Sequence, residues 1–178
     1  MSIPDIPDCD AIHSAPELIA YTCALESEAA DRYQELADQM EVHNNPEVAE
    51  LFRKLSALSD QLRERYLNSS EGMELPHVAP WDYRFECIEL LQTDNMDDIH
   101  YLMTPYHVVE LALRCKKRQI EFSIHMSETH DDDGIIRMAQ DFRNEQTKHI
   151  HLLEQWLIEY PEPDEDWHED HDPPTLQE

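Results

Sequence analysis

Five polar residues stand inside helical stripes that are otherwise small or apolar, and their types limit the chemistry available to the chain. They are one acid, one base, one imidazole and two neutral hydrogen-bonding groups: Glu26, Lys116, His149, Ser59 and Gln146. Residues on such a stripe are expected to face the interior of a helical domain. A carboxylate and an ammonium placed there favour a buried ion pair, because charges removed from water must be matched.

Other catalytic chemistry finds little support in the chain. There is no glycine-rich phosphate loop and no Gly-x-Ser-x-Gly motif. The four cysteines form no Cys-x-x-Cys pair, so we expect free thiols and no zinc ribbon at Cys9, Cys23, Cys87 and Cys115. A net charge of −27 argues against nucleic acid and anionic membranes as partners. No stretch could span a bilayer, and we expect a soluble cytoplasmic protein.

The helices that must position the five polar residues each have a start signal. Ser14-Ala15-Pro16-Glu17 is a capping box. Asn45-Pro46 and Thr104-Pro105 each place an N-cap residue before a proline at the first helical position. The acids of Asp131-Asp132-Asp133 are suited to cap the last helix and to complement its dipole. Four long helices are therefore predicted.

The helices form one domain, predicted over residues 14–160. It follows an N-terminal arm (1–13) and precedes an acidic, proline-rich tail (161–178), which has little apolar surface to bury. Proline and glycine interrupt the helical pattern between residues 68 and 103, where only residues 84–91 predict a short extra helix. A connection this long acts as a crossover that brings the third helix parallel to the second.

The two halves of the domain repeat one another when Glu26 is aligned with Lys116. Ser59 then matches Gln146, and Leu62 matches His149. The chain resembles the rubrerythrin-like branch of the ferritin-like superfamily over residues 15–67 and 104–158. The likeness is carried by the segments LESEAADRY (25–33), ELFRKL (50–55) and NEQTKH (144–149). The resemblance implies an all-α, ferritin-like four-helix bundle of two antiparallel hairpins joined by a long crossover, and it implies a homodimer.

The resemblance also implies a carboxylate-bridged di-iron site built from six ligands. Two helices would each supply one Glu, and the other two would each supply Glu-x-x-His. The matching positions in this chain are Glu26, Ser59, Leu62, Lys116, Gln146 and His149. Only Glu26 and His149 keep a ligand type, whereas two iron ions need several carboxylates. We therefore expect a degenerate di-iron site with no metal and no cofactor.

An interior polar cluster is expected in place of the metals. Its predicted members are Glu26, Tyr33, Ser59, Lys116, Gln146 and His149, with the neutral groups hydrogen-bonding to the Glu26–Lys116 pair. Lys116 could instead reach solvent between helices. A rotation of the third helix would turn Lys117 or Glu121 inward, and Glu110, Asp60 or Glu145 would then be further available acids.

These alternatives leave three functions open. The favoured one is a binding or structural protein, not a catalyst, that pairs with itself and with a basic or metal-bearing protein. The second is an oxidoreductase or iron-handling protein with a single metal at Glu26 and His149, completed by Glu121 or Glu145. The third is a metal-ion buffer that uses the acidic surface and a weak tail site at His168 and His171.

Overall fold

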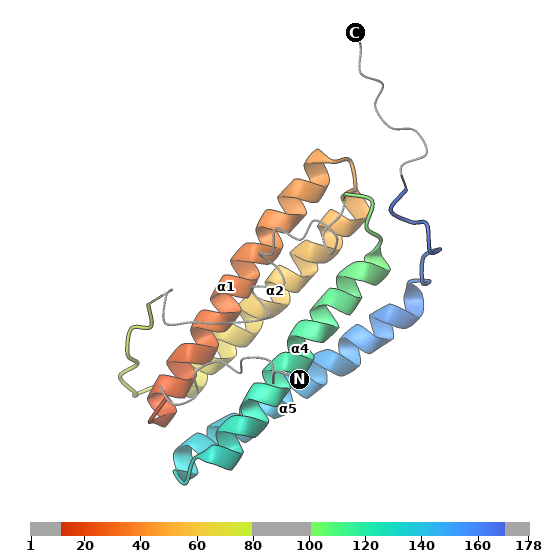
Figure 1. The fold of residues 1–178 in the computed structure, drawn as a ribbon. Helices are drawn as coiled ribbons and strands as arrows, with labels where there is room; N and C mark the ends of the chain where they lie inside the picture. The colour runs from red at the N-terminus through yellow and green to blue at the C-terminus, as the bar shows by residue number, and fades with distance from the viewer. Residues whose placement is uncertain (1–11, 80–100, 170–178) are drawn as a thin grey trace.

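The computed structural model describes residues 12–79 and 101–169, and these residues form four long helices (Figure 1). The helices are α1 (Ala15–Val42), α2 (Pro46–Ser69), α4 (Pro105–Thr129) and α5 (Asp133–Glu159). All four begin at or beside the predicted start signals. The short helix expected at residues 84–91 lies outside the described residues. Within the described ranges, no helix is long and apolar enough to cross a membrane.

The helices are arranged as two antiparallel hairpins, α1 with α2 and α4 with α5, lying side by side (Figure 1). Asn45, at the start of α2, donates from its side-chain amide to the carbonyls of Tyr101 (3.2 Å) and Met103 (2.9 Å). These bonds hold the start of α2 beside the start of α4. The two helices therefore run parallel, and the all-α bundle with a long crossover is confirmed.

The helix starts follow the predicted capping chemistry with two corrections. Ser14 Oγ accepts from the backbone N–H of Glu17 at 3.3 Å, but the Glu17 carboxylate accepts from His13 N at 2.7 Å and not from Ser14 N. The Asn45 side chain makes no capping bond to α2, because its amide is used on the chain before α4. Asp132 caps α5 as expected, accepting from the backbone N–H groups of Gly134 and Ile135.

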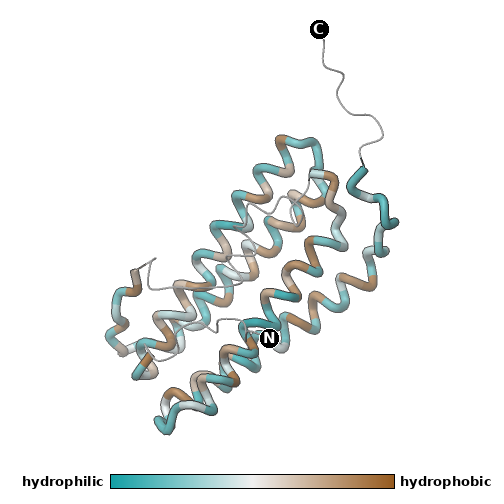
Figure 2. The backbone as a smooth tube through the Cα atoms, viewed as in Figure 1, coloured by the Kyte–Doolittle hydropathy of each residue, from teal (hydrophilic) through white to brown (hydrophobic). Residues whose placement is uncertain are grey.

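Apolar and polar stretches alternate along every helix (Figure 2), and the buried apolar residues form two separate clusters. One cluster lies at the end where α1 meets α2, and it contains Phe52, Val109 and Leu153. The other lies at the opposite end and contains Leu62 and Phe142. Because apolar burial is the main driving force for folding, these clusters hold the bundle together at both ends. The residues between them are free to be polar.

The cysteines and the tail depart from expectation. Cys23 is a free, buried thiol, but Cys115 is disulfide-bonded, so the expectation of free thiols is wrong for that residue. Cys9 and Cys87 lie outside the described residues.

In the first part of the tail, Trp167 packs against the core, and its ring centroid lies 4.0 Å from that of His107. The prediction that the tail has little to bury is therefore wrong for Trp167.

Candidate functional site: a buried polar layer

A polar layer separates the two apolar clusters and takes residues from all four helices. On every helix, the cluster residues stop on one side of these positions and resume on the other. The buried polar residues of the layer are Glu26 of α1, Ser59 of α2, Lys116 and Gln119 of α4, and Gln146 of α5. The layer lies at the level where the aligned halves of the sequence predicted the interior cluster.

The centre of the layer is an ion pair between α1 and α4. Lys116 Nζ lies 3.2 Å from Glu26 Oε1 and 3.4 Å from Oε2. The side chains are 7% exposed for Lys116 and 0% for Glu26, so Lys116 does not reach solvent. Lys117, its neighbour, is exposed. The helix thus adopts the register in which Lys116 faces inward.

Gln146 completes the bonding of the Glu26 carboxylate. Its Nε2 donates to Glu26 Oε1 at 3.0 Å, so that one oxygen accepts from both Lys116 and Gln146. The Gln146 Oε1 atom is buried without a hydrogen-bond partner among the described residues. Three helices are therefore tied through a single carboxylate.

Tyr33 and Ser59 are buried in or beside the layer, but neither hydrogen-bonds to the ion pair within the described residues. The Tyr33 ring stacks on Phe52, with centroids 6.2 Å apart. Burial, and then the Glu26 charge, raise the pKa of the Tyr33 hydroxyl well above its ordinary value. Tyr33 is therefore a neutral phenol at physiological pH, and it lies close enough to Glu26 for the carboxylate charge to affect its pKa.

His149 lies one turn beyond Gln146 on the same face of α5. Burial and the neighbouring Lys116 charge lower its pKa from 6.5 to about 4, against the opposite effect of Glu26. Its Nδ1 atom is buried without a partner among the described residues. The imidazole is neutral at pH 7. The predicted hydrogen bond from His149 to Glu26 is not formed among the described residues.

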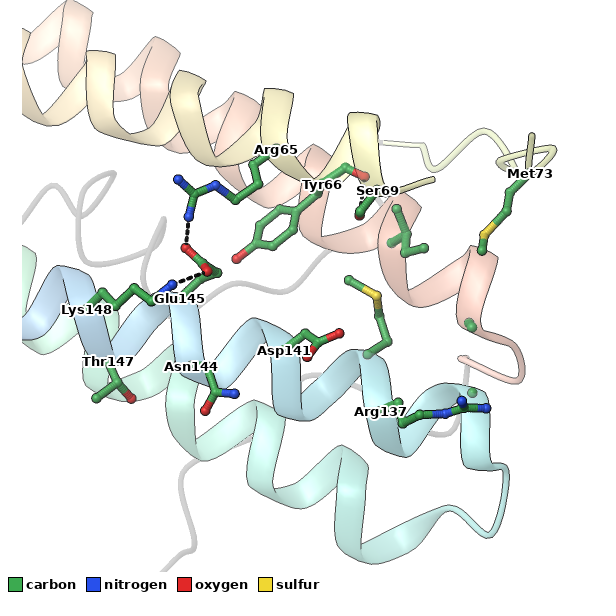
Figure 3. A pocket seen from close by; sticks show the side chains of 14 residues that line it. Arg65, Tyr66, Ser69, Met73, Arg137, Asp141, Asn144, Glu145, Thr147 and Lys148 are labelled. Carbon is green, nitrogen blue, oxygen red and sulfur yellow. Dashed lines mark hydrogen bonds and ion pairs between the residues drawn. The ribbon is translucent and has the colours of Figure 1, made fainter. Parts of the chain in front are cut away.

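The acids proposed for a rotated helix lie elsewhere. Glu121 is 62% exposed and pairs with Arg118 on the outer face of α4. Glu145 belongs to a second ion cluster at the surface, where it pairs with Arg65 of α2 and lies 2.6 Å from Lys148 Nζ (Figure 3). Burial acts to raise the pKa of Glu145, but Lys148 and Arg65 outweigh it and hold the pKa below its usual range.

Several buried polar groups of the described residues escaped the sequence reasoning, among them those of Gln119, Ser56 and Tyr66. Gln119 stands three residues after Lys116, a spacing that places both on one helix face and could have identified it. Ser56 donates to the Ala30 carbonyl at 2.8 Å and ties α1 to α2. Tyr66 was assigned to the apolar stripe, yet its buried hydroxyl lies beside the Gln146 side-chain amide.

The residues of the layer do not fit a pair of iron ions. Hard ions of this kind take several oxygen ligands, preferably anionic ones. Among the residues that the structure describes, the layer offers one carboxylate, and an ammonium already lies against it. Across residues 12–79 and 101–169, no three His, Cys, Asp or Glu side chains are grouped so that they could hold a metal. In the tail, His168 is exposed, and His171 lies outside the described residues.

Two antiparallel hairpins packed around a buried polar layer define an all-α four-helix bundle, and comparison gives its family. The family model named Rubrerythrin matches residues 17–89. A crystal structure of an uncharacterized conserved protein from Magnetospirillum magnetotacticum MS-1 is 35% identical, with a TM-score of 0.63. The match covers 85% of this chain and 99% of that one. No curated protein sequence matches the chain. The chain belongs to the rubrerythrin-like family of the ferritin-like superfamily.

Proposed function

We propose that the protein is a non-catalytic, rubrerythrin-like binding or structural protein in which a Glu26–Lys116–Gln146 cluster takes the place of the metals. The observation that carries this proposal is the Lys116 amine, 3.2 Å from Glu26 Oε1 in a layer to which the described residues contribute no second carboxylate. A fixed positive charge at the position of a ligand repels any cation brought to Glu26. It also neutralises the carboxylate that a metal would otherwise neutralise.

The role we assign to the cluster is to keep the bundle folded without an ion. The ion pair joins α1 to α4 and Gln146 joins α5 to α1, so the two hairpins are connected through the middle of the bundle. The strongly acidic surface then favours a basic or metal-bearing protein as partner, and the family favours a homodimer. Light scattering should then give twice the mass of the chain.

Metal analysis of protein purified without chelator tests the proposal, followed by anaerobic titration with ferrous iron and exposure to oxygen or peroxide. We expect no stoichiometric iron and no absorption from an oxo-bridged ferric pair. Glu26→Gln tests the interior, and Asp60→Asn is the surface control. Two irons per chain, lost in Glu26→Gln and kept in Asp60→Asn, would overturn the proposal.

A single-metal oxidoreductase or iron-handling site at Glu26 and His149 is the main alternative. It draws support from the neutral imidazole with its unpartnered Nδ1 atom. One metal per chain that is lost in both Glu26→Gln and His149→Gln would establish it. Metal lost only on deletion of residues 161–178 would instead establish the metal-ion buffer.

A further inference from the structure

A groove of about 830 Å³ opens between α2 and α5, near the start of α1 (Figure 3). This volume is in the range of sites that hold small organic molecules. Its apolar surface comes from α1, from the end of α2 and the residues just after it, and from α5, and it includes Ile19, the Tyr66 ring, Met73 and Met138. Methionine side chains adapt their shape to a ligand, so two of them suit an elongated apolar body.

The charge of the groove is opposite to that of the chain. Acids outnumber bases by 40 to 13 in the whole sequence. The groove is lined by three bases and two acids, which are Arg65, Arg137, Lys148, Asp141 and Glu145. An anion repelled by most of this protein would therefore meet a locally favourable surface here.

The two ends of the groove differ in how their charges are paired. Figure 3 shows Arg65, Glu145 and Lys148 together at one end, where the carboxylate is held by both bases. At the other end, Arg137 donates from Nε to the Asp133 carbonyl at 3.2 Å, and it forms no ion pair with any described carboxylate. Its remaining guanidinium N–H groups are therefore available to a ligand. A guanidinium binds a carboxylate through two parallel hydrogen bonds.

Tyr66 provides a second observation at the groove, independent of Arg137. Its side chain lines the groove and is 3% exposed, and its hydroxyl has no hydrogen-bond partner among the described residues. Figure 3 shows this hydroxyl directed toward Glu145, at the end away from Arg137. Buried polar groups normally find a partner. A ligand that extends from Arg137 would bring a polar atom to this hydroxyl.

We infer that the groove binds an elongated amphipathic monocarboxylate. Its carboxylate pairs with Arg137, its apolar body lies on Ile19, Met73 and Met138, and a neutral polar group at its far end meets Tyr66. Asp141 stands one helical turn from Arg137 and disfavours a second ligand charge. The distance from residue 137 to residue 145 along α5 is about 12 Å, close to the length of a ten-carbon chain.

Calorimetric titration with decanoate tests the inference, with decanol and decanedioate as matched ligands. We expect saturable binding of one decanoate per chain, at least tenfold tighter than either matched ligand. Arg137→Gln should weaken decanoate binding at least tenfold, whereas Arg118→Gln, on the outer face of α4, should leave it unchanged. In methyl NMR spectra, decanoate should shift the signals of Met73 and Met138. Absence of saturable binding, equal affinity for decanol, or wild-type affinity in Arg137→Gln would each overturn the inference.

The role of Tyr66 has its own measurement. Wild-type protein should bind 10-hydroxydecanoate more tightly than decanoate, and Tyr66→Phe should remove that difference while keeping its affinity for decanoate. Equal affinities of the wild type for the two ligands would overturn the assignment of Tyr66. None of these variants changes Glu26, Lys116 or Gln146. A failure here is therefore distinct from a failure of the metal-free interior.

Discussion

Glu145 and Gln146 are neighbours in the sequence, yet they belong to two ion clusters of opposite character. Glu145 faces the groove with Arg65 and Lys148, whose side chains are 60% and 66% exposed. Gln146 faces the interior, where Lys116 is 7% exposed and Glu26 is fully buried. Ion pairs contribute differently to stability in the two places, because water screens the outer pairs and is largely excluded from the inner one.

Removal of the inner cation should have the largest effect. Lys116→Met leaves the Glu26 carboxylate buried and unpaired, and we expect the free energy of unfolding to fall by about 3 to 5 kcal/mol. Urea denaturation of the metal-free protein measures it. Lys148→Met is the matched outer variant and should change stability far less. If Lys116→Met keeps the wild-type melting temperature, the ion pair is not what stabilises the interior.

The inner hydrogen bond should rank second. Gln146→Leu removes the donor that lies 3.0 Å from Glu26 Oε1, and bonds to charged groups are worth about 1.5 to 3 kcal/mol. The same urea experiment applies, with the exposed Gln140→Leu as its control on α5. A loss no larger than that of Gln140→Leu would show that the Glu26 carboxylate is satisfied by Lys116 alone.

Acidification should destabilise the buried layer through His149, an effect that the outer cluster does not share. Its pKa in the folded protein is about 4, below the value of 6.5 for an unperturbed histidine, so the unfolded chain takes up the proton first. The contribution of His149 to the free energy of unfolding should be constant above about pH 6.5. It should fall as the pH drops toward 4, by about 1 kcal/mol after allowance for solvent screening.

The measurement for His149 is the difference in unfolding free energy between wild type and His149→Gln at pH 7 and at pH 5. The comparison with a variant removes the general effect of protonating a very acidic protein. His151→Gln, exposed on the same helix, is the control and should behave like the wild type. A pH dependence that survives unchanged in His149→Gln would exclude this residue as its source.

The outer cluster should give the smallest effect. Glu145→Gln weakens its pairs with Arg65 and Lys148, and exposed pairs contribute about 0 to 1 kcal/mol. Thermal denaturation in low and high salt measures this, and the wild-type difference between the two salt concentrations should shrink in the variant. A loss as large as that of Lys116→Met would mean that the groove cluster, and not the buried layer, holds the hairpins together.

Much of the fold could be predicted because its signals are local. Proline after an N-cap residue marks the starts of α2 and α4, and the apolar spacing places Leu62, Phe142 and Leu153 inside. The alignment of the two halves also brought Glu26 and Lys116 to one level. Which side chains contact one another across the bundle could not be predicted in the same way. Asn45 bonds to the chain before α4, and Trp167 packs on His107, through contacts more than fifty residues apart in sequence.

The sequence by itself determined the helices, their order and the polar residues that face inward, because helical periodicity fixes which side of a helix a residue occupies. Only the tertiary structure decided that Gln146, and neither Tyr33 nor Ser59, bonds to Glu26, and that Arg65 meets Glu145 at the edge of a groove. A hydrogen bond depends on differences of a few tenths of an ångström between side chains on separate helices. That precision arises from the packing of the whole bundle, which the spacing of residues along one helix does not encode.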